Sequence, residues 1–450
     1  MIVSPAFAGK RYAVLGLARS GLSTVETLLA SGAEVTAWDN REDARALVEG
    51  RAAIADPLGI DLTGFDGIVV SPGVPLNRHP IADAARAVNV PIIGDIELFA
   101  QARASLPPHR VVGITGTNGK STVTALVHHM CQSAALSVRM GGNIGLPILG
   151  QEPLPAGGVY VLETSSYQID LTQSLAADIA VLINLSPDHL DRYDGFEGYM
   201  ASKLRLFAMQ RAEQHAVFGC GDRHTLAAAH EVATTRGSER VHIVDPAALA
   251  GSSYGQDTWP SLQGPHNLQN AAIAVEIARL LGLTEAQWRP ALASFKGLSH
   301  RMERVAEADG VLYVNDSKAT NPASTAPALA AWPRIHWIVG GLPKSDDLDE
   351  CLPHIGSVVA AYTIGEAGPR FADLLEPLVP VRRSEMLCEA VRQAMDAAQP
   401  GEVVMLSPAC ASFDQFRDFE ARGDAFRDIV EALLGERRAA AASISSGGTA

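Results

Sequence analysis

The sequence has few cysteines and no long apolar run, and each shortage argues against a class of protein. Only five of its 450 residues are cysteine, they are scattered, and none forms a C-x-x-C pair. This pattern argues against a disulfide scaffold and favours a reducing compartment. No stretch approaches the roughly 20 apolar residues that a membrane-spanning helix needs, and no signal-peptide pattern is evident. We therefore expect a cytoplasmic protein without a membrane partner.

Positive charge is also scarce. The chain has 36 Lys and Arg against 50 Asp and Glu, a formal net charge of −14. So acidic a chain is a poor candidate for general nucleic-acid binding, although a single loop can still bind an anion. With 47% hydrophobic and 19% charged residues, the composition is that of a soluble globular protein, and the length predicts two or three domains.

The most informative stretch is GITGTNGKST at residues 113–122. It follows an apolar strand pattern and precedes a helical pattern over 123–130, which is typical of a phosphate-binding loop. Lys120 is expected on the terminal phosphates of a nucleotide and the Ser121 hydroxyl on Mg²⁺. The spacing departs from the standard one, because Ile114 stands where the first glycine belongs. The motif predicts ATP or GTP binding and leaves the reaction open.

Polar side chains also follow other apolar runs of this segment. Glu163 and His189 each come just after a predicted strand. Ligands of a parallel α/β sheet collect at the carboxyl ends of its strands, so both residues are expected on the edge that carries the phosphate loop. A carboxylate there is a natural Mg²⁺ ligand. Asn267 and Asn270 share one face of the first turn of a later helix; N-capping explains one of them, and the second suggests a ligand contact.

The first 106 residues have a pattern of their own. Residues 11–39 predict strand, turn, helix and strand, the opening of a Rossmann-like fold. The turn has Ala18 in place of the middle glycine of the dinucleotide fingerprint, which hinders close approach of a pyrophosphate. A nucleotide or sugar-nucleotide diphosphate bound nearby is therefore favoured over a redox dinucleotide. Asp39 and Arg41 follow the second strand and are either ligand contacts or exposed loop charges.

Composition and pattern together predict an α/β protein of three domains. A Pro-Pro pair at 107–108 reads as a linker, which places the first domain at 1–106. The central domain with the phosphate loop is expected at 107–297, and a third α/β unit at 298–437. Residues 438–450 are rich in Ala, Ser and Gly, and we expect a disordered tail there.

These loops together resemble the Mur ligase family, in order and over nearly the whole chain. The resemblance rests on the stretches 116–121, 142–145, 163–166, 188–189, 266–270, 300–301, 315–321 and 407–416. Within the family, the loops 316–321 and 407–416 point to the member that adds D-glutamate. The Asp-Asn-Pro-Arg loop expected of the diaminopimelate-adding member is absent from the sequence. The resemblance implies a Rossmann-like N-terminal domain, a central P-loop ATPase-like parallel sheet and a Rossmann-like C-terminal domain.

The implied activity is an ATP-dependent ligation in peptidoglycan precursor synthesis. D-glutamate would be joined to UDP-N-acetylmuramoyl-L-alanine through an acyl phosphate, with release of ADP and phosphate, by a monomer. Alternatives are a relative that adds another amino acid, a folylpolyglutamate synthetase-like enzyme, a nucleotide-dependent binding protein and a nicotinamide oxidoreductase. The Rossmann-like domain ahead of the ATP domain argues against the folate alternative.

The resemblance also implies site residues. ATP would be bound by Gly116, Thr117, Asn118, Gly119, Lys120, Ser121, Thr122, Asn267, Asn270, Arg301 and Asp316. The UDP-substrate would be bound by Leu17, Ala18, Arg19, Ser20, Asp39, Asn40, Arg41, Ser71, Gly73, Asn143 and His189. D-glutamate would be bound by Thr320, Lys344, Ser412 and Phe419.

Two Mg²⁺ sites are implied as well. Their ligands would be Ser121, Glu163, His189 and a carbamylated Lys203, and the catalytic residues would be Lys120, Glu163, His189 and Lys203. From the sequence alone Lys203 is expected to be a surface lysine on a helix, and only the resemblance gives it a role.

Overall fold

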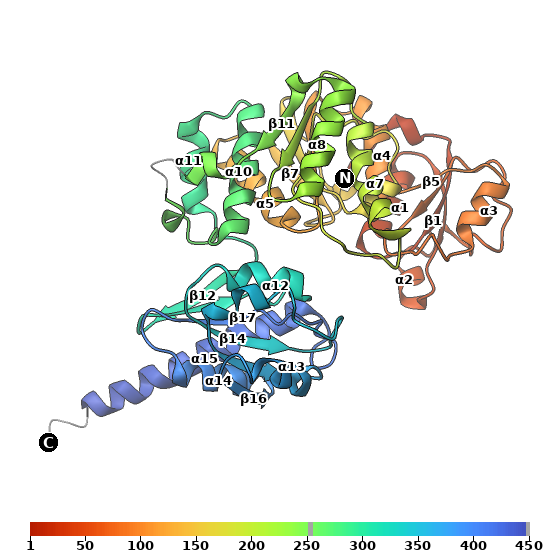
Figure 1. Cartoon of the computed structure of the whole chain (residues 1–450). Helices are drawn as coiled ribbons and strands as arrows, with labels where there is room; N and C mark the ends of the chain where they lie inside the picture. Colours follow the sequence, from red (N-terminus) through yellow and green to blue (C-terminus); the bar gives the residue numbers. More distant parts are fainter. Residues whose placement is uncertain (251–254, 447–450) are drawn as a thin grey trace. The chain divides into compact units, whose positions relative to one another are not determined.

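The computed structural model describes residues 1–250 and 255–446, and these residues form an α/β protein with three β-sheets (Figure 1). The chain divides into two compact units, Met1–Leu249 with Gln269–Leu292, and Ala250–Leu268 with Ala293–Ala450. Each unit is described by itself. No helix in the described part of the chain is long and apolar enough to cross a membrane.

The first sheet has five parallel strands in the order β3-β2-β1-β4-β5. Its strands are β1 Arg11–Leu15, β2 Glu34–Trp38, β3 Ala53–Ile54, β4 Gly67–Val70 and β5 Ile92–Ile93. Its helices are α1 Arg19–Ala30, α2 Glu42–Ala46, α3 Ile81–Ala87 and α4 Asp95–Ala102. The predicted Rossmann-like opening is confirmed. The strand order changes direction between β1 and β4, which is where open α/β sheets bind ligands.

The central sheet has six parallel strands in the order β11-β10-β9-β6-β8-β7. The strands are β6 His109–Thr115, β7 Val138–Gly142, β8 Gly158–Glu163, β9 Ile179–Leu182, β10 His215–Gly219 and β11 Val241–Val244. The helices are α5 Lys120–Ser133, α6 Ser166–Asp170, α7 Gly195–Ala208, α8 Arg223–Arg236, α9 Ala247–Ala250, α10 Pro265–Leu280 and α11 Glu285–Ser294.

The structure explains the irregular spacing of the phosphate loop. Ile114, in the place of the missing glycine, is fully buried inside β6. The strand therefore continues to Thr115, and the loop itself begins at Gly116.

One hydrophobic core joins the first two sheets, since both contribute side chains to a single buried cluster. Phe99 of α4 packs edge-on against Tyr160 of β8, with ring centroids 5.0 Å apart. The backbone N–H of Ile2 and the hydroxyl of Thr27 both donate to the carbonyl oxygen of Leu149, at 2.8 and 3.1 Å. These contacts hold the first two sheets together.

The third sheet, in the second unit, has the order β12-β13-β17-β14-β15-β16. Only β12 is antiparallel to its neighbour. The strands are β12 Glu303–Ala308, β13 Val311–Asn315, β14 Ile335–Gly340, β15 Val358–Ile364, β16 Val381–Glu385 and β17 Val403–Leu406. The helices are α12 Pro322–Leu329, α13 Gly368–Leu375, α14 Leu387–Ala397 and α15 Phe419–Ser446.

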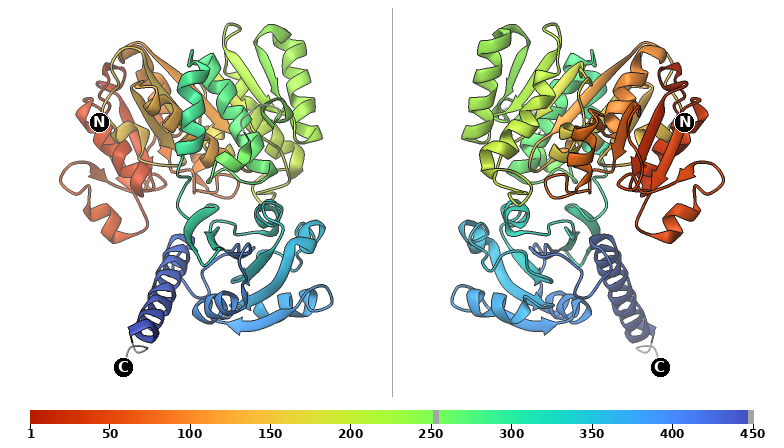
Figure 2. Two further views of the ribbon diagram at one scale, coloured as in Figure 1. Left: turned by 90° about the vertical axis from the view of Figure 1, so that its left-hand side faces the viewer. Right: turned by 90° about the vertical axis from the view of Figure 1, so that its right-hand side faces the viewer.

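The end of the chain differs from the expectation. Helix α15 continues to Ser446 (Figure 2), so residues 438–446 are helical where a disordered tail was predicted. Ala-rich sequence has high helix propensity, and a helix already formed at Phe419 extends more readily than a new one starts. The remainder of the expected tail, 447–450, lies outside the described residues.

Candidate functional site

The carboxyl edge of the central sheet brings the phosphate loop and Glu163 together. Glu163 is the last residue of β8 and is 1% exposed. Its Oε2 accepts a hydrogen bond from Ser121 Oγ at 2.6 Å, and its Oε1 accepts one from Asn143 Nδ2 at 2.8 Å. A buried carboxylate therefore lies directly beside the phosphate loop, as the strand pattern predicted.

The phosphate loop leads into an uncapped helix. Helix α5 begins at Lys120 without a side-chain N-cap, and the positive end of its dipole favours an anion at this point. Gly119 precedes it with φ +82°, and a Cβ there would lie 2.4 Å from Asn270 Oδ1. Glycine is thus required both by the left-handed backbone and by the close approach of α10. Asn270 is one of the predicted nucleotide contacts and does adjoin the loop.

Lys203 is buried, so the expectation of a surface lysine was wrong. It is 1% exposed, and its Nζ donates to the carbonyl oxygen of Gly116 at 2.9 Å. Nζ of Lys120 donates to the same oxygen at 3.0 Å. Burial first, and the charge of Lys120 second, hold the pKa of Lys203 well below its usual value.

The sequence carried a signal for this burial. Tyr199, Lys203, Leu206 and Phe207 follow the i, i+4, i+7, i+8 spacing of one helix face, and all four are buried. Lys203 Nζ also lies 4.5 Å from the centroid of the Tyr199 ring. Helical periodicity alone therefore places this lysine on the inner face of α7.

His189 lies on the loop after β9, next to Asp188, with Nε2 and Oδ2 3.5 Å apart. Its side chain is 48% exposed, and its backbone has φ +53°. Partial burial lowers the pKa of His189, and the positive charge of Lys120 adds to this effect, while Asp188 opposes it. The lowered pKa favours the neutral imidazole, which is the form that can bind a metal ion.

The donors at this edge fit Mg²⁺ in company with a nucleotide. In residues 1–250 and 255–446 no group of three or more His, Cys, Asp or Glu is placed to hold a metal ion by itself. Mg²⁺ is usually bound by one or two protein oxygens together with phosphate oxygens and water. The hydroxyl of Ser121 and the carboxylate of Glu163 are such a pair of hard oxygen donors.

The loops at the carboxyl edge of the first sheet are held together by Asp39. Its carboxylate accepts the backbone N–H of Leu17 at 2.7 Å and that of Arg41 at 2.9 Å. Burial alone would raise the pKa of Asp39, but these two hydrogen bonds and the Arg41 guanidinium lower it. Ser71 joins the group, since its Oγ donates to the carbonyl of Gly16 at 3.2 Å. The structure thus brings together the predicted UDP-substrate residues of the β1, β2 and β4 loops.

A cleft of about 320 Å³ lies between the loops of the first two sheets. Its lining includes Ala18, Arg19 and Ser20 from the first sheet's edge and Asn143 from the central one. Arg19 spans it, with Nη2 3.4 Å from the carbonyl of Gly145. The cleft therefore leads from the predicted UDP-substrate residues to Asn143, which hydrogen-bonds Glu163.

The second unit brings together the residues predicted for D-glutamate. Lys344 Nζ donates to Thr320 Oγ1 at 3.3 Å, and the loop before Ser412 pairs with the loop before Lys344 through Ala411 and Leu342. Ser412 is 2% exposed. A cation and hydroxyl groups from separate loops thus share one carboxyl edge.

Phe419 borders these loops at the start of α15. Its carbonyl accepts Ser317 Oγ at 2.8 Å, and its ring lies 3.8 Å from Lys318 Nζ.

Asp316 lies at the same edge, at the end of β13. Its Oδ2 accepts Ser407 Oγ at 2.8 Å and its Oδ1 the N–H of Met302 at 3.2 Å. Burial raises the pKa of Asp316 to about 7, against the effect of these two hydrogen bonds. Asn267, Arg301 and Asp316 belong to the second unit, so their place beside the phosphate loop stays a prediction.

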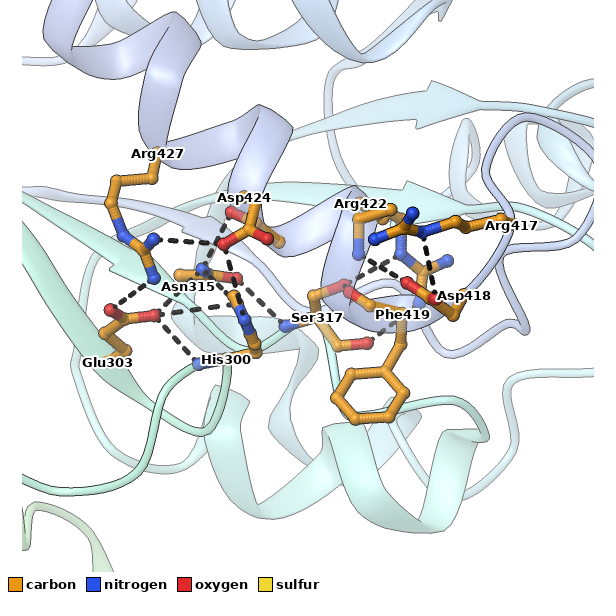
Figure 3. Close-up of polar contacts among 12 residues, drawn as sticks. His300, Glu303, Asn315, Ser317, Arg417, Asp418, Phe419, Arg422, Asp424 and Arg427 are labelled. Atoms are coloured by element: carbon orange, nitrogen blue, oxygen red, sulfur yellow. Dashed lines mark hydrogen bonds and ion pairs between the residues drawn. The ribbon is translucent and has the colours of Figure 1, made fainter. Parts of the chain in front are cut away.

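Arg422 is a buried residue that the sequence reasoning missed (Figure 3). It is 1% exposed and donates to the carbonyls of Ser317, Cys410 and Ala411 at 2.8, 3.0 and 3.1 Å, and to Ser317 Oγ at 3.0 Å. It ties α15 to two of the loops that carry the predicted D-glutamate residues. A lone arginine in an amphipathic helix gives no sequence signal for this role.

Each of the three sheets lies largely in a segment of the chain that matches a model of a known protein family. Residues 10–94 match the family model "Mur ligase MurD-like, N-terminal domain", residues 114–278 "Mur ligase middle domain", and residues 300–410 "Mur ligase, glutamate ligase domain".

Curated relatives match along the whole length. A UDP-N-acetylmuramoylalanine–D-glutamate ligase of Novosphingobium aromaticivorans is 78% identical over 439 residues, 98% of each chain. The ligase of the same name from Sphingopyxis alaskensis is 60% identical over 439 residues, 96% of this chain and all of that one.

Among solved structures, MurF ligase from Thermotoga maritima in complex with ADP has the same fold. It has a TM-score of 0.56 at 16% identity and covers 97% of this chain and 98% of its own. The resemblance read from the loops is confirmed, and the chain belongs to the Mur ligase family.

Proposed function

We propose that this chain is an ATP-dependent ligase that adds D-glutamate to UDP-N-acetylmuramoyl-L-alanine. The relatives that it matches over 96–98% of its length carry that activity in their names. ATP phosphorylates the carboxylate of the L-alanyl group, the amine of D-glutamate attacks the acyl phosphate, and phosphate leaves as the amide forms.

The observation that carries the proposal is the cluster of Lys120, Lys203 and Glu163 around the phosphate loop. Phosphoryl transfer to a carboxylate brings two anions together, so positive charge at this point lowers the barrier. Lys120 is proposed to neutralise the terminal phosphates, and the positive end of the α5 dipole, which has no side-chain N-cap, supports this role. Mg²⁺ bound by Ser121 and Glu163 would supply additional neutralisation of the phosphates.

Lys203 is proposed to act as a carbamate formed with CO₂. Only a neutral amine adds to CO₂, and burial, by lowering the pKa of Lys203, raises the share of that neutral form. The carbamate would be an anionic oxygen ligand that, with the neutral imidazole of His189, completes a second Mg²⁺ site. ¹³C NMR in ¹³C-bicarbonate tests this: a carbamate resonance is expected in the wild type and not in Lys203→Arg. Its absence from the wild type would contradict the proposal.

The other two substrates are proposed to bind at loops whose chemistry suits them. The UDP end of the acceptor is proposed to lie on Asp39 and the start of α1, with its sugar in the cleft that ends at Asn143. D-glutamate has two carboxylates, and Lys344 with Thr320 supplies a cation and a hydroxyl to bind them.

An amino-acid panel tests the specificity. Phosphate release from ATP is measured with UDP-N-acetylmuramoyl-L-alanine and one amino acid at a time. D-glutamate is expected to support turnover at least 100-fold above the others, and either substrate alone is expected to support none. Preference for another amino acid would indicate a different family member, and fast ATP hydrolysis without either substrate would contradict ligation.

A further inference from the structure

Asn184, on the loop after β9, forms a two-way hydrogen-bond pair with the phosphate loop. Its Oδ1 accepts the backbone N–H of Asn118 at 2.8 Å, and its Nδ2 donates to the carbonyl of the same residue at 3.2 Å. Its own backbone carbonyl accepts the N–H of Thr117 at 3.0 Å. Three backbone groups of the phosphate loop, the N–H groups of Thr117 and Asn118 and the carbonyl of Asn118, are thus bonded to one residue.

Neighbouring contacts extend this connection. Thr117 Oγ1 accepts the N–H of Ser186 at 3.0 Å and donates to the carbonyl of Ser186 at 3.1 Å. Several hydrogen bonds therefore join the phosphate loop to the segment 184–186, which continues to His189. The phosphate loop, which has Ile114 in place of its first glycine, is thus held by the segment after β9.

An amide is the only side chain of this size that fits the pair. The N–H of Asn118 requires an acceptor and its carbonyl requires a donor, which also fixes which atom of Asn184 is oxygen and which is nitrogen. An aspartate would place a second carboxylate oxygen against the carbonyl of Asn118, and an alanine would leave both groups without this partner.

The pairing fixes the backbone of the phosphate loop just ahead of α5. The N–H groups of Thr117 and Asn118 are both bonded to Asn184, and α5 begins two residues later, at Lys120, without a side-chain N-cap. We infer that Asn184 is a positioning residue, which holds the loop in the one conformation that directs the start of α5 toward the β- and γ-phosphates of the nucleotide. This rests on the proposed use of ATP but not on the identity of the amino acid.

Asn184→Asp tests the inference by direct binding. Dissociation constants of the magnesium complexes of ATP and ADP, and of AMP, are measured by calorimetry. Loss of loop pre-organisation reduces the competent fraction of the protein, so the affinity for ATP is expected to fall at least tenfold and that for AMP less than threefold. KM for ATP rises correspondingly, while KM for D-glutamate stays within twofold.

Gln214→Glu is the matched control. Gln214 also bonds the backbone through both atoms of its side-chain amide. Its Nε2 donates to the carbonyl of Ala176 at 2.8 Å, and its Oε1 accepts the N–H of Arg211 at 2.7 Å. It precedes the first residue of β10 and so lies at the opposite edge of the sheet. It is expected to lower the melting temperature as much as Asn184→Asp does and to leave ATP affinity unchanged. If Asn184→Asp does not fold, Asn184→Ala takes its place under the same criteria.

Two results would overturn the inference: ATP affinity within threefold of the wild type, or equal losses of ATP and AMP binding. Nucleotide binding is measured without the UDP-substrate and without D-glutamate. A wild type that binds ATP but fails to ligate D-glutamate would therefore refute the proposed function and leave the inference about Asn184 standing.

Discussion

At the scale of residues, the site depends on two ionisable side chains, Glu163 and Lys203, that are buried without an ion-pair contact between them. The two oxygens of Glu163 accept hydrogen bonds from the neutral donors Ser121 and Asn143. Lys203 and Lys120 share one carbonyl oxygen a short distance away. Removing such groups from water costs stability, and the cost is consistent with a site built to receive phosphates and cations.

Glu163→Gln keeps the size of the side chain and removes its charge. We expect kcat to fall by about 100-fold or more, because the nucleotide's metal ion loses its anionic ligand. The dissociation constant of the UDP-substrate should stay within threefold. Turnover and calorimetric binding measured on the same preparation check this, and a variant that turns over at the wild-type rate would refute the assigned role.

Lys203→Met removes a buried amine whose folded pKa lies below its unfolded value of about 10.4. Between those two values the unfolded wild type binds the extra proton, so wild-type stability rises with pH up to about 10. In CO₂-free buffer the variant should be more stable than the wild type at pH 7, by on the order of 1 kcal/mol. The gain should shrink as the pH approaches 10.

Urea unfolding at several pH values measures this difference, with Lys344→Met as the control for an exposed lysine. A difference that is independent of pH would show that Lys203 is not held neutral.

At the scale of elements, each sheet places polar loops at the carboxyl ends of its strands, and single side chains bind these loops to one another. Asp39 does this in the first sheet, Asn184 in the central sheet and Arg422 in the third. Each of them bonds to backbone groups that have no partner within a strand or helix, and buried backbone groups require such partners. The loops are therefore held at fixed positions although their backbones are irregular.

Arg422→Lys tests this arrangement at the start of α15. A lysine cannot reproduce the planar set of donors that meets Ser317, Cys410 and Ala411. We expect a loss of about 2–4 kcal/mol in unfolding free energy, together with a KM for D-glutamate raised at least tenfold and a KM for the UDP-substrate unchanged.

Denaturant unfolding and steady-state kinetics provide the measurement. Arg427→Lys is the control, because Arg427 is 30% exposed and pairs with Glu303 and Asp424 on the same helix and sheet (Figure 3). Equal effects of the two substitutions would show that Arg422 has no special link to the glutamate loops.

At the scale of the whole molecule, strongly periodic segments were predictable and long-range contacts were not. The opening strand and helix of the first sheet, the phosphate loop and Glu163 at a strand end followed from local pattern. The burial of Lys203 also follows from helix periodicity. The expectation of a surface lysine rested on its residue type and not on this spacing.

Asn184 and Arg422 were not predictable in this way. Asn118 lies 66 residues from Asn184 in the sequence, and Ser317 lies 105 residues from Arg422. Neither spacing nor composition reports contacts over such distances. The predicted domain boundaries at 106 and 297, and the meeting of Arg301 and Asp316 with the phosphate loop, stay predictions.

The most direct test of the central claim follows one oxygen atom. UDP-N-acetylmuramoyl-L-alanine labelled with ¹⁸O in its alanyl carboxylate is incubated with ATP and D-glutamate, and the released phosphate is analysed by mass spectrometry. Activation as an acyl phosphate at the Lys120–Glu163 edge predicts one ¹⁸O atom in each phosphate released. Unlabelled phosphate, formed at the rate of the ligated product, would contradict the account.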